Sequence, residues 1–156
     1  MDKNILGTNV VTQIALVVND VEATARAYAD FFGVECPGWA WTAPYEQART
    51  EYMGKPSQAR AKLAFINIGE HLSLEIIEPD ENPSTWREGL EKNGEGVHHI
   101  AFNVDGMKKI TERLERNGIS LTQKGEYTGG RYAYFDSSGP LKTVIELLES
   151  GPARLA

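Results

Sequence analysis

Two stretches of the chain repeat each other, and each carries a side chain that can bind a metal ion. Residues 11–18 read VTQIALVV and residues 97–104 read VHHIAFNV, which aligns Gln13 with His99. An amide oxygen and an imidazole nitrogen can both ligate a divalent ion. His99 is favoured over its neighbour His98 because it shares the register of Gln13. Side chains alternate along a strand, so His98 is expected on the opposite face.

A second repeated pair supplies two carboxylates. Residues 72–78 read LSLEIIE and residues 143–149 read TVIELLE, which aligns Glu75 with Glu146. Each glutamate stands between two aliphatic residues, and a carboxylate buried in such surroundings is costly unless something satisfies it. Two carboxylates that face one cavity also repel each other, and a divalent cation removes that cost.

Two similar halves can pack about a pseudo-two-fold axis, which would bring the four matched positions together. One imidazole, one amide and two carboxylates suit a borderline divalent ion such as Zn, Co, Ni or Mn. We expect no organic cofactor. The predicted metal ligands are Gln13, Glu75, His99 and Glu146.

Each half reads as a strand, a helix and then about three further strands. In the first half, a buried strand over 11–18 leads to a helix that Asp20 can cap and Gly33 can end. The second half repeats this layout with a strand over 98–104 and a predicted cap at Asp105.

Hairpins are predicted in both halves, and one strand in each half is poorly defined. The hairpins pair 61–68 with 71–78 and 131–136 with 142–149. The undefined strands lie within 38–52 and near 119–124. The aromatic cluster Trp39, Trp41 and Tyr45 is consistent with core packing, with an interface or with the wall of a substrate pocket.

These patterns predict one compact α+β domain made of two tandem βαβββ modules, with the metal site where the two modules meet. The first module covers 8–81 and the second covers 96–150. Between them, a linker helix over 82–95 is expected to turn Trp86 and Leu90 inward.

The composition of the chain argues against two classes of binding partner, nucleic acids and membranes. The 156-residue chain has a net charge of −6 and a pI near 5.1, which argues against a basic surface for nucleic acid or membrane. It has neither an apolar run long enough to cross a bilayer nor a signal peptide at its start. Cys36 is the only cysteine, so no intrachain disulfide can form. We therefore expect a cytoplasmic protein with no nucleic-acid or membrane partner.

These motifs together resemble the vicinal oxygen chelate superfamily, the glyoxalase, bleomycin resistance and dioxygenase group. The resemblance covers nearly the whole chain, and residues 86–105 (WREGLEKNGEGVHHIAFNVD) look most like methylmalonyl-CoA epimerases. It implies a glyoxalase-like fold, in which the two βαβββ modules form an open curved sheet around a metal site. It also implies a homodimer and metal ligands on the first and last strands of each module. Those positions fall on Gln13, Glu75, His99 and Glu146.

Two features depart from the epimerase pattern. Gln13 stands where the epimerases usually have histidine, and residues 56–58 (PSQ) stand where they carry a second proton-transfer glutamate. The order Gln-Glu-His-Glu instead resembles one class of glyoxalase I. That class has an arginine and an asparagine that grip glutathione, and here Val17 and Pro79 occupy those places.

The sequence and the resemblance together favour a metal-dependent isomerase or epimerase. It would abstract a proton alpha to a thioester or ketone carbonyl through a metal-stabilised enolate, with an acyl-CoA thioester or a thiol adduct as substrate. Glu146 is the expected base and Glu75 its partner acid. The alternatives are a glyoxalase I-type lactoylglutathione lyase and a non-catalytic small-molecule binding or resistance protein. An extradiol dioxygenase is disfavoured, because its iron site needs two histidines and Gln13 replaces one.

Overall fold

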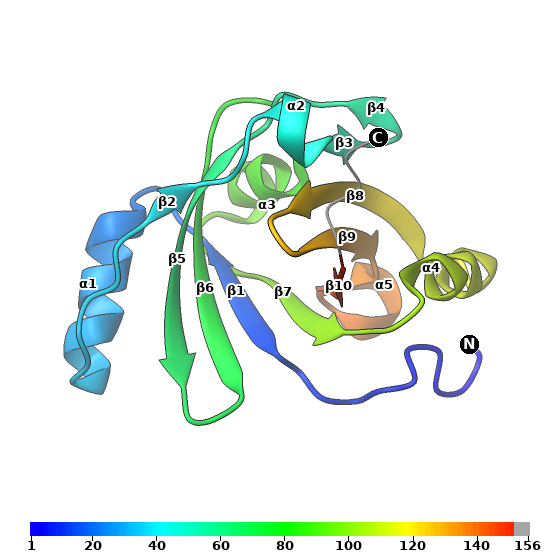
Figure 1. Cartoon of the computed structure of the whole chain (residues 1–156), viewed down its shortest axis with the longest axis horizontal. Coiled ribbons are helices and arrows are strands. Elements are labelled where there is room, and N and C mark those ends of the chain that lie inside the picture. The colour runs from blue at the N-terminus through cyan, green and yellow to red at the C-terminus, as the bar shows by residue number, and fades with distance from the viewer. Residues whose placement is uncertain (152–156) are drawn as a thin grey trace.

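The computed structural model describes residues 1–151, which form one sheet with helices around it (Figure 1). The strands are β1 Gln13–Val17, β2 Ala40–Trp41, β3 Glu51–Tyr52, β4 Lys55–Pro56, β5 Ala61–Ile68, β6 Leu72–Pro79, β7 Gly96–Asn103, β8 Ser120–Tyr127, β9 Gly130–Asp136 and β10 Val144–Ser150. The helices are α1 Val21–Phe32, α2 Tyr45–Ala48, α3 Thr85–Asn93, α4 Met107–Arg116 and α5 Ser138–Leu141.

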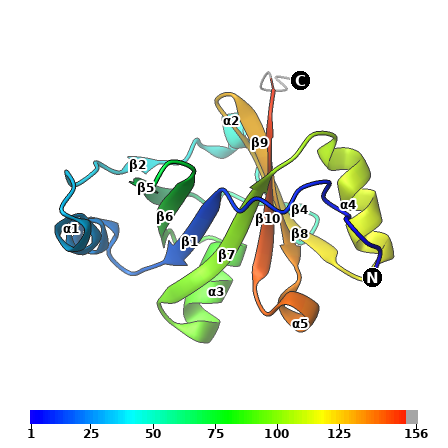
Figure 2. The same cartoon turned by 90° about the horizontal axis from the view of Figure 1, so that it is seen from below.

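The sheet has the order β2-β5-β6-β1-β7-β10-β9-β8-β3-β4 and is curled into an open half-barrel (Figures 1 and 2). At its centre β1 and β7 pair antiparallel, while β6 lies parallel to β1 and β10 lies parallel to β7. The predicted α+β fold with an open curved sheet is confirmed. The four strands that carry the predicted ligands are thereby neighbours.

The first strand and helix form as their residues predict. The carboxylate of Asp20 accepts a hydrogen bond from the Ala23 amide (2.9 Å), and Gly33 ends α1 in the left-handed conformation that glycine tolerates. Ile14 and Leu16 pack against the apolar face of α1. The alternate residues of β1 are left to face the inside of the half-barrel.

The start of α4 differs from the prediction. Its N-cap position is Gly106 rather than Asp105, and no side chain of that residue caps it. Instead, the Glu149 carboxylate on β10 accepts hydrogen bonds from the amides of Gly106 (2.5 Å) and Met107 (3.0 Å). Arg131 on β9 pairs with the same carboxylate. The helix is therefore capped from the sheet, by a residue distant in sequence.

The poorly defined segment 38–52 is split between the two edges of the sheet. β2 pairs with β5 at one edge, whereas β3 pairs with β8 at the other. The chain between them, which includes α2, crosses from one edge to the other (Figure 1). Trp39 and Trp41 are 41% and 44% exposed, so they are not core residues.

Helix α3 falls within the predicted linker and packs against β1, β6 and β7. Ser84 caps it by accepting a hydrogen bond from the Arg87 amide (3.0 Å), and Trp86 and Leu90 are buried as predicted. The module limits 8–81 and 96–150 remain a prediction. Within residues 1–151, the helices are all too short or too polar to cross a membrane.

Candidate metal centre

Three of the four predicted ligands meet inside the half-barrel. His99 Nε2 lies 3.0 Å from Glu146 Oε2 and 3.3 Å from Glu75 Oε2, and all three residues are buried. Ala15 lies beside both Glu75 and His99 in the sheet, and Ala101 lies beside Glu146. Small side chains at these two positions leave room for the longer ones around them.

The atoms that face each other in this group lack satisfactory partners. Three buried atoms have no hydrogen-bond partner of acceptable geometry in residues 1–151: Glu75 Oε2, His99 Nε2 and Glu146 Oε2. One Nε2 proton could in any case serve only one carboxylate. Metal bonds of roughly 2.1 Å place neighbouring donor atoms roughly 3.0–3.4 Å apart at octahedral or tetrahedral angles. The observed separations of 3.0 and 3.3 Å fit that spacing, so this group could hold a divalent ion.

The two carboxylates shift the protonation of their surroundings. Burial by itself would lower the pKa of the His99 imidazole, but Glu146 and Glu75 outweigh it and raise that pKa to about 9. Burial also raises the pKa of the Glu75 carboxyl, and the charge of Glu146 adds to the rise although His99 opposes it. A proton on His99 is one way to offset the two carboxylates, and a divalent ion is another.

Gln13, the fourth predicted ligand, lies on β1 in the expected register. It pairs with Ala101 of β7, two residues from the pair that Ala15 makes with His99. Its side chain is half-buried. Gln13 as a ligand stays a prediction.

His98 does not point away from His99 as strand alternation predicts. Ala15 pairs with His99 and the next residue of β1 pairs with Val97, so His98 is the extra residue of a β-bulge. The two Nδ1 atoms lie 2.8 Å apart, and His98 Nε2 lies 2.9 Å from the carbonyl oxygen of Thr85. Burial, together with the neighbouring His99, lowers the pKa of His98 to about 3, which keeps this ring neutral.

Aromatic side chains wall the group. The ring of Tyr134 lies 4.9 Å from that of His99, centroid to centroid, and Tyr134 pairs with Glu146 across β9 and β10. The Trp86 indole donates to the Tyr134 hydroxyl (3.0 Å). Burial raises the pKa of Tyr132 to about 12 and also raises the pKa of Tyr134 well above its ordinary value, so both phenols are neutral. Neither tyrosine was predicted from the sequence to lie at the site. The signal available was their separation by two residues in a strand, which places both side chains on one face.

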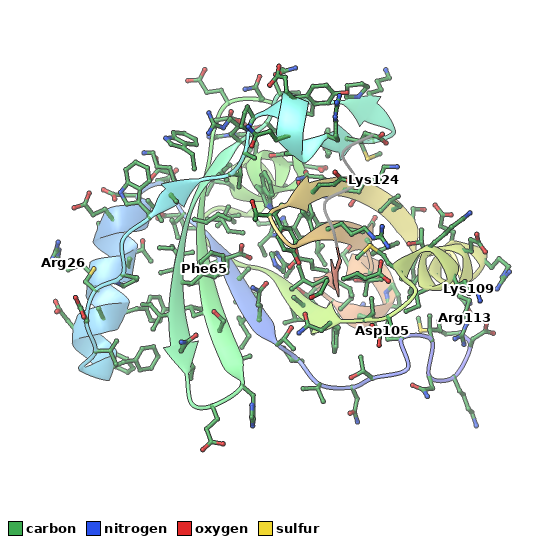
Figure 3. All side chains as sticks on the ribbon, viewed as in Figure 1. Arg26, Phe65, Asp105, Lys109, Arg113 and Lys124 are labelled. Carbon is green, nitrogen blue, oxygen red and sulfur yellow. The ribbon has the colours of Figure 1, made fainter. Side chains whose placement is uncertain are left out.

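Phe65 lies on β5 (Figure 3). Its partner directly opposite, on the antiparallel strand β6, is Glu75. Directly opposed residues of antiparallel strands point to the same face of a sheet. Phe65 is 44% exposed, whereas Glu75 is 6% exposed. An accessible aromatic surface therefore lies on the face that carries the buried carboxylate.

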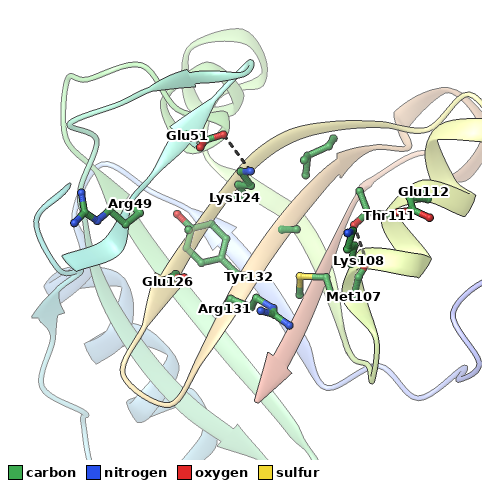
Figure 4. Close-up of a pocket in the computed structure, with 13 residues that line it drawn as sticks. Arg49, Glu51, Met107, Lys108, Thr111, Glu112, Lys124, Glu126, Arg131 and Tyr132 are labelled. Atoms are coloured by element: carbon green, nitrogen blue, oxygen red, sulfur yellow. Dashed lines mark hydrogen bonds and ion pairs between the residues drawn. The ribbon is translucent and has the colours of Figure 1, made fainter. Parts of the chain in front are cut away.

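A separate cavity of about 460 Å³ is lined by residues of β3, α4, β8 and β9 and by Arg49, which follows α2 (Figure 4). Its lining carries charges of both signs and contains none of the predicted metal ligands. Two of its cations are already paired: Lys124 Nζ lies 3.2 Å from Glu51 Oε2, and Arg131 pairs with Glu149.

Solved structures share this fold. A methylmalonyl-CoA epimerase from Mycobacterium tuberculosis is 19% identical, with a TM-score of 0.62 over 91% of this chain and 88% of that one. A methylmalonyl-CoA epimerase in complex with methylmalonyl-CoA and NH4+ is 24% identical, with a TM-score of 0.61 over 92% and 95%.

Sequence comparison gives the family. The uncharacterized protein YqjC of Bacillus subtilis (strain 168) is 28% identical over 95 residues, which are 59% of this chain and 67% of YqjC. The family model described as the glyoxalase/bleomycin resistance protein/dioxygenase superfamily matches residues 12–135. That match covers more than half of the chain, including β1, β6 and β7 with Gln13, Glu75 and His99. The chain therefore belongs to the glyoxalase/bleomycin resistance protein/dioxygenase superfamily.

Proposed function

We propose that this protein is a metal-dependent isomerase or epimerase that removes and returns the proton next to the carbonyl group of an acyl-CoA thioester. The observation that carries the proposal is the pair of buried carboxylates 3.0 and 3.3 Å from His99 Nε2, without hydrogen-bond partners in residues 1–151. The likeness to solved epimerases, one of them in complex with methylmalonyl-CoA, supports the choice of a thioester.

Glu75, His99 and Glu146 are the proposed metal ligands, with Gln13 as the fourth. A divalent ion held by them would supply positive charge beside the carbonyl oxygen of the substrate, where negative charge develops as the proton leaves. Zn, Co, Ni and Mn all suit this mixed set of nitrogen and oxygen donors.

Glu146 is the proposed general base. Glu146 is 3% exposed, and its Oε2 atom lies 3.0 Å from His99 Nε2. Bulk water therefore does not solvate this carboxylate oxygen. Tyr134, which faces it, is a neutral phenol and adds no charge. General-base assistance contributes roughly 10²–10⁴-fold to a rate, so the remainder must come from stabilising the charge that develops on the substrate.

Glu75 is the proposed partner acid. Because its pKa is raised, it holds a proton more readily than an ordinary glutamate. Glu75 and Glu146 reach the group from β6 and β10, on opposite sides of the central strand pair. Removal by one and return by the other is what inversion at a carbon requires.

Ser57 supports this assignment, because it stands where the epimerase pattern has a second glutamate. Its hydroxyl donates to the carbonyl oxygen of Pro83 (2.6 Å) and accepts from the Ala59 amide (3.2 Å). Ser57 thus holds a turn and cannot serve as a proton donor at neutral pH, which leaves that task to Glu75.

Deuterium exchange tests the proposal. The metal-reconstituted protein is incubated with methylmalonyl-CoA in D₂O, and incorporation at the carbon between the two carbonyls is followed by mass spectrometry. We expect exchange that is lost in Glu146→Gln and retained in Glu70→Gln, a change at an exposed hairpin residue. An absence of exchange in a protein that has bound its metal would exclude this activity.

A glyoxalase I-type lyase is the second candidate, and the order Gln13, Glu75, His99, Glu146 favours it. The same carboxylates would then move a proton of a hemithioacetal. Turnover of the methylglyoxal–glutathione adduct, without exchange into methylmalonyl-CoA, would establish this alternative. We also propose a homodimer, which sedimentation of the purified protein tests, and a cytoplasmic location, which cell fractionation tests.

A further inference from the structure

The bulge at His98 places a second imidazole directly behind His99. Both rings pack against Tyr134, with centroids 5.7 and 4.9 Å from its ring. His98 is 7% exposed, and its polar contacts in residues 1–151 are the Thr85 carbonyl oxygen and His99 Nδ1. No carboxylate contacts it in this part of the chain. His98 is therefore a buried imidazole without a counter-ion.

These contacts fix the direction of each hydrogen bond. A carbonyl oxygen only accepts, so His98 Nε2 carries a proton and donates to Thr85. In a neutral ring the other nitrogen, Nδ1, then has a lone pair and accepts from His99 Nδ1, 2.8 Å away. The opposite direction would need a second proton on His98, a charge buried without a partner. Once His99 has lost its Nε2 proton, its remaining proton lies on Nδ1, and the Nε2 lone pair is free to face Glu75 and Glu146.

Helix α3 holds His98 in this arrangement. The Thr85 amide, at the start of the helix, donates to Gln123 Oε1 (2.8 Å), which holds in place the residue whose carbonyl oxygen His98 reaches. Gly89 lies one turn further on, and a Cβ there would meet His98 Cδ2 at 2.8 Å. A side chain on residue 89 would have to displace the ring.

We propose that His98 is a positioning residue, which sets the tautomer of His99 so that Nε2 is the atom that binds the metal. This inference rests on the metal centre proposed above, and it does not depend on the identity of the substrate. Groups that orient a ligating histidine typically change metal affinity roughly 10–100-fold when they are removed.

Metal affinity tests the proposal directly. Zn²⁺ binding is measured by competition with a chromophoric chelator for the unsubstituted protein, His98→Leu and His98→Asn. Asparagine places an acceptor oxygen two bonds from Cβ, as Nδ1 is in histidine, whereas leucine has no acceptor. We expect about 10–100-fold weaker binding in His98→Leu and recovery of most of that loss in His98→Asn.

Gly89→Ala gives a second variant that leaves both histidines in place. Alanine favours a helix over glycine by roughly 1 kcal/mol, so a loss of Zn²⁺ affinity would not arise from a weaker helix. We expect at least a tenfold loss, as the ring of His98 is displaced. His71→Ala, at an exposed hairpin position, is the matched control and should bind Zn²⁺ as the unsubstituted protein does.

Nitrogen-15 NMR of the Zn²⁺-loaded protein reads the tautomers without any substitution. We expect His98 protonated on Nε2 alone and His99 protonated on Nδ1 alone. Another tautomer at either ring, or equal affinity in His98→Leu and the unsubstituted protein, would overturn the role of His98 alone. Failure of the unsubstituted protein to bind Zn²⁺, Co²⁺, Ni²⁺ or Mn²⁺ would overturn the metal centre with it. Metal binding without deuterium exchange would refute only the proposed reaction.

Discussion

Lowering the pH from 9 to 7 should weaken metal binding about 50-fold, because the ion must displace a proton from His99 and half of the rings are already protonated at pH 9. The pKa of that imidazole is raised to about 9 in the metal-free protein, so below pH 9 the ring is protonated and its Nε2 lone pair is unavailable. Each pH unit below the pKa makes deprotonation about 1.4 kcal/mol more costly, which is about tenfold in affinity.

The neighbouring titratable groups leave this pH window clear. The pKa of His98 is lowered to about 3 and that of Tyr132 is raised to about 12, and burial also raises the pKa of Tyr134. Glu75 has a raised pKa, so a proton on it would steepen the dependence at the acid end. The sign is therefore fixed throughout, with affinity rising as the pH rises toward 9.

Chelator-buffered Zn²⁺ titrations between pH 6.5 and 8.5 measure this slope. Calorimetry in buffers of different ionisation enthalpy counts the protons released, and about one per ion is expected near pH 7.5. His71→Ala removes an exposed histidine and should leave both results unchanged. An affinity that stays constant over this range, with no proton released, would contradict the location of the ion at His99.

Three further results are expected. Glu146→Gln should keep its melting temperature within a few degrees while turnover falls roughly 10²–10⁴-fold or more, measured against Glu70→Gln. The metal-free protein should lose up to about 3 kcal/mol of stability as pH rises from 6.5 to 9, because the folded pKa of His99 exceeds its ordinary value and its proton stabilises the fold only at lower pH; urea unfolding across that range would show it. Glu149→Gln should cost roughly 1–3 kcal/mol by weakening the cap of α4 and leave Zn²⁺ affinity unchanged, measured by urea unfolding and chelator competition.

The repeat explains why part of the site was predictable. Matching registers in two halves set which residues share a face, and that was enough to bring together Glu75, His99 and Glu146. The same logic fixed α1, since Asp20 and Gly33 are local signals. Predicting the face of each strand residue from strict alternation requires regular pairing without bulges, and the bulge at His98 interrupts that pairing. No local pattern in the sequence predicts this extra residue in the strand.

Other features depended on contacts distant in sequence. The cap of α4 comes from Glu149 on another element, so the nearby Asp105 was the wrong choice. The short strand β3 pairs with β8 of the second half, and β4 pairs with β3 at the edge of the sheet. Two-residue strands have too little periodicity to predict, and their partner is set by where the edge of the curled sheet ends.

Helix α3, which links the two halves, has no counterpart in the repeat, although the strands of the proposed metal site occur in both halves. Thr85 and His98 lie behind His99, whereas no helix precedes the strand of Gln13 in residues 1–12. The two halves are thus not interchangeable. A chain lengthened or cut between β6 and β7 would keep every ligand in its sequence, yet loosen the imidazole. In a duplicated protein the segment between the halves looks dispensable. Here that segment is α3, and it gives His99 a support that Gln13 lacks.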